Sequence, residues 1–97
     1  MFITILSGRV AEEDWRTLEK SFERAIRTIP QGIKTSMLIQ CQAEPKLWQI
    51  ITTWESEETY IIAKDQKTAN RCVELFCNAG STPYRNDYKV LGHYTRV

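Results

Sequence analysis

The chain has 97 residues, with 13 Lys and Arg against 12 Asp and Glu, a formal net charge of +1 and 42% hydrophobic residues. This length allows one domain and leaves no room for a second hydrophobic core. The composition and the near-zero net charge disfavour intrinsic disorder and a strongly basic nucleic-acid-binding surface. We therefore expect one globular domain over residues 1–97.

The first expected element is a strand over residues 2–10, a run rich in β-branched and apolar side chains. The run lacks the features of a signal peptide and is too short to span a bilayer, so a cytoplasmic location is expected. An amphipathic helix follows. Its apolar residues recur at helical spacing from Trp15 to Ile29, and Pro30 and Gly32 end it.

The middle of the chain predicts a hairpin of two antiparallel strands, residues 33–42 and 47–55, joined by a short connection that contains Pro45. Ser56 is the expected N-cap of a second helix, because two glutamates follow it in the first turn. This helix should end near Lys64.

Helical spacing resumes at Ala69 and ends at Ala79 and Gly80, where glycine can adopt the left-handed conformation of a helix C-terminus. The last expected element is a strand over residues 87–96, in which apolar and polar side chains alternate. The element order therefore predicts a ferredoxin-like α+β fold, with helices on one face of a four-stranded antiparallel sheet.

Both faces of the expected sheet are partly apolar. The third strand places Trp48 and Trp54 on one face and Leu47 and Ile51 on the other. The helices of so short a chain cover one face only, so we expect the other face to pack against a second copy in a homodimer. The alternation leaves open which face the helices cover, so both tryptophans belong either to the core or to the dimer interface.

Two classes of binding site are not expected. The three cysteines lack the spacing of a disulfide framework or a zinc site, and His93 is the single histidine, so no metal site is predicted. The same element order builds RNA-recognition domains, but their glycine–aromatic signature is absent and Phe2 is the lone aromatic residue of the first strand.

The segment from Ile50 to Ser56, Ile-Ile-Thr-Thr-Trp-Glu-Ser, resembles the strand-to-helix element of the antibiotic biosynthesis monooxygenase family. The segment Gly32 to Leu38 and the landmark of Ala79, Gly80 and Pro83 are similar to the same family, and the element order matches over nearly the whole chain. The resemblance implies a dimeric α+β barrel. In the branch that oxidises aromatic polyketides or quinols, it also implies a cofactor-independent monooxygenase with a pocket between sheet and helices.

The resemblance suggests a site as well. Trp54 and Tyr60 match a Trp and Tyr pair of the polyketide-oxidising branch, although the same two residues could simply pack the sheet against the second helix. His93 is a candidate general base or ligand contact. The further candidates for lining a pocket are Ser7, Arg9, Ser36, Trp48 and Phe76. The expected partner is a small aromatic molecule, and no cofactor is expected.

The haem-degrading branch of the family carries an Asn, a Trp and an axial His where this chain has Ser7, Ala63 and Val73. Valine cannot ligate iron, so haem degradation of that type is not expected. Because a fold does not determine a function, a non-enzymatic ligand-binding or structural dimer is the alternative interpretation.

Overall fold

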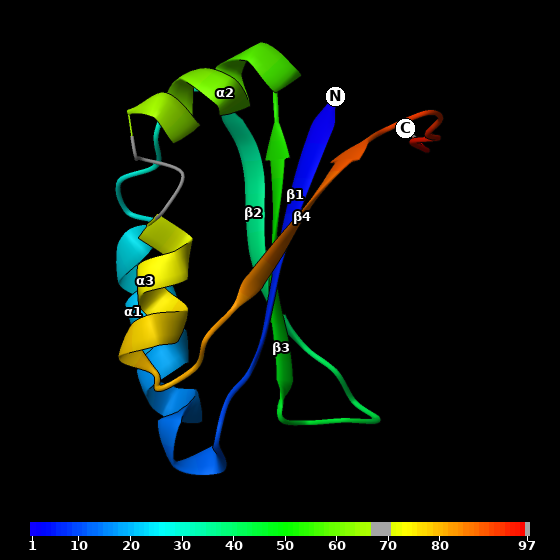
Figure 1. Cartoon of the computed structure of the whole chain (residues 1–97). Coiled ribbons are helices and arrows are strands. Elements are labelled where there is room, and N and C mark those ends of the chain that lie inside the picture. Colours follow the sequence, from blue (N-terminus) through cyan, green and yellow to red (C-terminus); the bar gives the residue numbers. More distant parts are fainter. Residues whose placement is uncertain (67–70, 97) are drawn as a thin grey trace.

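A computed structural model describes residues 1–66 and 71–96, which form a four-stranded sheet and a layer of helices (Figure 1). In chain order the elements are β1 (Phe2–Arg9), a short 3-10 helix (Glu12–Asp14), α1 (Trp15–Ala25), β2 (Ile33–Gln40), β3 (Leu47–Trp54), α2 (Glu57–Asp65), α3 (Arg71–Asn78) and β4 (Tyr84–Lys89). The strand order is β2-β3-β1-β4, and every neighbouring pair is antiparallel. The predicted ferredoxin-like fold and the β2–β3 hairpin are confirmed.

The helices lie on one face of the sheet. Helices α1 and α3 pack side by side against that face, while α2 lies across one end of it (Figure 1). No helix covers the other face within the described residues. None of the described helices has the length and apolar character needed to cross a membrane.

The core lies between the helices and the even-numbered residues of β1 and β3. The register of β1 and β3 places the core on this face. Phe2 pairs with Trp54 and Leu6 pairs with Ile50, which brings apolar side chains to the same side of the sheet. Trp48 and Trp54 are only 4% and 2% exposed, and both belong to buried clusters. The interpretation that places these tryptophans in a dimer interface is therefore wrong.

Local signals set the ends of α2 and α3. Ser56 Oγ accepts a hydrogen bond from the Thr59 backbone N–H at 3.2 Å, and Thr59 Oγ1 accepts one from the Ser56 N–H at 3.2 Å. This capping box confirms Ser56 as the N-cap of α2. Gly80 has a φ of 76° just beyond α3, which confirms the expected left-handed residue there. The expected start of that helix at Ala69 lies outside the described residues.

Three elements have boundaries that differ from the sequence prediction by two or more residues. Helix α1 ends at Ala25 rather than at residue 29, because the amides of Arg27 and Thr28 donate to carbonyls three residues back and tighten the chain into turns. Strand β2 ends at Gln40 rather than at residue 42.

The third difference concerns the last strand, which covers residues 84–89 instead of 87–96. Its neighbour is β1, and Lys89 already pairs with Phe2 at the start of that strand. After the bond from the Val90 amide to the Met1 carbonyl, the chain has passed the end of its partner strand. The following residues project beyond β4, away from α1 and α3 (Figure 1).

Candidate functional site

A narrow cleft lies between the helix-facing side of the sheet and the C-terminal part of α1. The cleft is partly open to solvent, and its cavity volume is about 50 Å³. The walls of the cleft therefore lie close together. The lining is mostly apolar and consists of Thr4, Leu6, Phe22, Ala25, Ile26, Ile29, Pro30, Ile33, Ser36, Ile50, Thr52, Trp54, Tyr60, Arg71, Cys72 and Arg85.

Three hydroxyl side chains form a row across the sheet at the floor of the cleft. Thr52 of β3 pairs with Ser36 of β2 on one side and with Thr4 of β1 on the other. The Ser36 and Thr52 hydroxyl oxygens are 3.2 Å apart and share a hydrogen bond. Trp54 Nε1 donates to Thr4 Oγ1 at 3.2 Å. The row places polar groups that can orient a ligand inside an otherwise apolar site.

An aromatic cluster forms one end of the cleft. The rings of Trp54 and Tyr60 meet edge to face with their centroids 5.2 Å apart, and Phe2 lies 5.2 Å from Tyr60 on another side. Tyr60 is 3% exposed, so its ring is fixed by this packing. Its hydroxyl donates to Asp87 Oδ1 at 3.3 Å and accepts from Arg85 Nη1 at 3.4 Å, two long hydrogen bonds that lead towards the surface of β4.

The cleft also contains two guanidinium groups. Arg71, at the start of α3, donates through Nη1 to the carbonyl oxygen of Thr28 at 2.6 Å, while Arg85 reaches in from β4. Beside them, burial raises the pKa of the Cys72 thiol, and the positive charges of Arg85 and Arg71 oppose that rise. Cys72 is therefore a thiol at neutral pH.

The structure brings three of the sequence-predicted residues, Trp54, Tyr60 and Ser36, together in the cleft. Trp48 and Phe76 do not line it. They lie in the adjacent core cluster, where both side chains are buried by α1 and α3. Strand alternation alone cannot distinguish the cleft from the adjacent core cluster, because both lie on the helix-facing side of the sheet.

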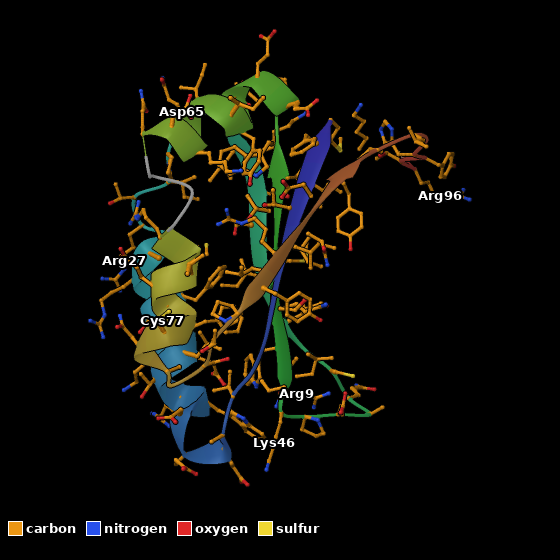
Figure 2. The ribbon with its side chains drawn as sticks, viewed as in Figure 1. Arg9, Arg27, Lys46, Asp65, Cys77 and Arg96 are labelled. Atoms are coloured by element: carbon orange, nitrogen blue, oxygen red, sulfur yellow. The ribbon has the colours of Figure 1, made fainter. Side chains whose placement is uncertain are left out.

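The remaining candidates lie elsewhere. Ser7 is on the opposite face of the sheet, where it accepts a hydrogen bond from Gln49 Nε2 at 2.9 Å. Arg9 lies near the loop between β2 and β3 and forms an exposed ion pair with Glu44 at 2.7 Å (Figure 2). His93 is exposed in the segment beyond β4, because that strand ends before it.

Sequence reasoning missed Thr4, Thr52, Arg71 and Arg85. The two threonines did leave a signal, because each interrupts an apolar series on one face of its strand. The arginines left none, since an arginine at the start of a helix, such as Arg71, or on an edge strand, such as Arg85, is ordinary until its partners are known.

This chain resembles known proteins in its fold but not detectably in its sequence. No family model matches this sequence, and no curated protein matches it significantly. The fold, in contrast, is that of structures named as antibiotic biosynthesis monooxygenases, which confirms the resemblance at the level of the fold.

Three solved structures illustrate this likeness. The haem-degrading protein MhuD from Mycobacterium tuberculosis, with two haems bound in its active site, has a TM-score of 0.78 at 16% identity over 98% of this chain and 100% of its own. SnoaB, a cofactor-independent oxygenase from Streptomyces nogalater, has a TM-score of 0.71 at 13% identity over 98% of both chains. A proposed antibiotic biosynthesis monooxygenase from Deinococcus radiodurans has a TM-score of 0.71 at 14% identity, over 100% of this chain and 98% of its own.

The likeness to MhuD raises the question of whether this cleft suits haem. Its lining contains no histidine, and the chain's single histidine, His93, is outside it. Burial keeps the Cys72 thiol protonated, and the Tyr60 hydroxyl is already hydrogen-bonded to Asp87. Across the described residues, no group of three or more His, Cys, Asp or Glu side chains could hold a metal ion. The described part of the lining therefore offers no axial ligand for a haem iron.

Proposed function

We propose that the protein is a cofactor-independent monooxygenase that oxidises a small aromatic or quinol-like molecule in this cleft. The observation that carries the proposal is the combination of a narrow apolar space, the aromatic wall of Trp54 and Tyr60, and the hydroxyl row on its floor. Close walls favour a flat ligand, and the hydroxyl groups can hydrogen-bond to its oxygen atoms. The shared fold with SnoaB, itself named a cofactor-independent oxygenase, supports this choice.

The chemistry requires an acidic C–H group in the substrate, as in an anthrone. A base removes the proton, and the resulting carbanion transfers electrons to O₂ and forms a C–O bond. The peroxide anion so formed takes up a proton, and the resulting hydroperoxide loses water to leave a carbonyl group. One oxygen atom enters the product and the other leaves in water, so the substrate supplies all four electrons.

In this scheme the residues of the cleft stabilise the anion and move the proton. Tyr60 and Asp87 offer a path from the buried cleft to the exposed side of β4, because the phenol O–H already donates to the carboxylate. Trp54 acts as an aromatic wall rather than as a donor to the ligand, since its Nε1–H is bonded to Thr4. The narrow, mostly apolar cleft limits the access of water to the reactive anion.

The test is oxygen consumption in the presence of a panel of anthrones and quinols. Wild-type protein should consume one O₂ per molecule of anthrone converted to the quinone. A variant with a blocked cleft, Ala25→Phe, should lose this activity while it still unfolds cooperatively. Absence of turnover with every panel member would favour the second candidate, a ligand-binding dimer without chemistry.

We propose further that two copies associate through the face of the sheet opposite the helices. This open face carries apolar side chains from all four strands, among them Ile3, Ile5, Ile51, Met37, Ile39 and Tyr88. Met37 is 49% exposed and Tyr88 is 45% exposed, which is unusual for side chains of a sheet. A second copy offers the same apolar surface, so a two-fold interface would cover both faces at once.

A further inference from the structure

The described lining of the cleft has an excess of positive charge, and the Asp87 carboxylate, which accepts a hydrogen bond from the Tyr60 hydroxyl, lies outside that lining. Two of the lining residues, Arg71 and Arg85, are cationic, and no acidic side chain belongs to the described lining. They come from different elements. Arg71 is the first residue of α3 and donates to the Thr28 carbonyl oxygen, and Arg85 lies on the helix-facing side of β4, opposite Leu6. The two guanidinium groups therefore approach one space from two walls.

The interior of the cleft experiences both charges. Cys72 follows Arg71 in α3 and lines the cleft, partly buried, and the electrostatic effects of Arg85 and Arg71 both favour its thiolate form. Low-dielectric walls focus such a field, so an anion in the cleft would gain more from it than an anion at the open surface. The positions of these arginines thus favour negative charge within an apolar site.

We infer that the ligand of this cleft is a flat apolar molecule that carries one anionic group, such as a carboxylate. This inference rests on the proposed function, because it names the class of molecule that the same cleft binds. The ring system lies against the apolar wall and Trp54, and the anionic group lies between Arg71 and Arg85. A guanidinium group is a planar fork of N–H donors that matches the two oxygens of a carboxylate.

The contacts of Arg85 support its role in binding. Its Nη1 donates to the Tyr60 hydroxyl at 3.4 Å, and the Tyr60 ring is fixed between Phe2 and Trp54. The guanidinium group is therefore positioned before a ligand arrives, which reduces the entropy lost on binding. Arg71 is held in the same way, because its Nη1 donates to the Thr28 carbonyl oxygen.

Two fluorescent probes with the same ring skeleton test the charge directly. Anilinonaphthalene sulfonate carries a sulfonate group, and phenylnaphthylamine is its neutral counterpart. Wild-type protein should bind the sulfonate probe about tenfold more tightly, the gain expected from a partly exposed charge-assisted contact. Added salt should weaken binding of the sulfonate probe and leave binding of the neutral probe unchanged.

Variants then assign the effect to the cleft. Arg85→Gln and Arg71→Gln should each remove most of the preference for the sulfonate probe, whereas Arg85→Lys should retain part of it. Arg16→Gln, an exposed arginine of α1 that does not line the cleft, is the matched control and should keep the full preference. The cleft-blocking Ala25→Phe should weaken binding of both probes, which shows that they do not bind on the open face.

Each outcome decides the inference. Equal or tighter binding of the neutral probe by the wild type would overturn the anionic ligand class and leave the proposed oxidation of a neutral aromatic molecule standing. An unchanged preference in both Arg→Gln variants would also overturn it. No binding of either probe, together with no turnover in the oxygen assay, would overturn both the ligand class and the proposed function.

Discussion

Gly8 of β1 and Phe76 of α3 lie against each other where α3 packs on the sheet. A Cβ atom placed on Gly8 would lie 2.8 Å from Phe76 Cδ1 and 2.7 Å from Ser81 Oγ, both shorter than van der Waals contact allows. The Phe76 ring is completely buried, so it has no free space into which it could move. The absence of a side chain at residue 8 therefore sets how closely α3 packs on the sheet.

The first prediction follows from this contact. Gly8→Ala should lower the free energy of unfolding by about 1–3 kcal/mol, because the added methyl overpacks the core. Urea denaturation monitored by tryptophan fluorescence measures the change. Gly92→Ala is the control, because nothing lies within 4 Å of that Cβ position, and its effect should stay within about 0.5 kcal/mol. Equal stability of the two variants would contradict the tight contact.

The second prediction concerns the open face. Ile51→Lys places a charge near the middle of that face, on β3, and should raise the dissociation constant of the homodimer at least about 100-fold, because the charge would be buried without a partner. Light scattering at micromolar concentration measures this. Ile61→Lys, at a 48% exposed position on α2, should leave the dimer intact. A monomeric wild-type protein would overturn the proposed interface.

The third prediction tests the proton path. Tyr60→Phe keeps the aromatic ring between Phe2 and Trp54 but removes the hydroxyl that joins Asp87, so stability should change little while kcat falls about 100-fold at similar KM. The control is Tyr94→Phe, since Tyr94 is 77% exposed beyond β4. Unchanged kcat in Tyr60→Phe would leave the ring with a packing role only.

The fourth prediction uses the buried thiol. Because burial raises the pKa of Cys72, alkylation by iodoacetamide at pH 8 should modify the exposed Cys77 first and Cys72 more slowly. Arg85→Gln removes a positive charge that favours the thiolate, so the pKa of Cys72 should rise further and its alkylation profile should move to higher pH. Mass spectrometry of the modified peptides distinguishes the two sites.

The raised pKa of Cys72 also makes the stability of the folded chain depend on pH. The folded chain holds the Cys72 proton more tightly than the unfolded chain, so this group makes unfolding easier as the pH rises into the alkaline range. Cys72→Ala should flatten that part of the stability profile. Equal alkylation rates for Cys72 and Cys77 would contradict both expectations.

Much of the fold could be predicted from local pattern. The β2–β3 hairpin, the N-cap at Ser56 and the glycine beyond α3 each depend on a few neighbouring residues, and each was predicted correctly. The prediction was wrong where an element's end depends on distant residues. β4 stops at Lys89 because β1 offers no partner beyond Phe2, a constraint that the alternation in residues 90–96 does not contain.

The candidate site divides in the same way. Trp54, Tyr60 and Ser36 were proposed from motif and residue type, and the structure places all three in one cleft. The sequence by itself determined the order of the elements, because strand alternation, helical spacing and capping are properties of adjacent residues. Only the tertiary structure decided which sheet face the helices cover and brought Arg71 and Arg85 into one space, because strand register and helix packing depend on contacts between residues far apart in the chain.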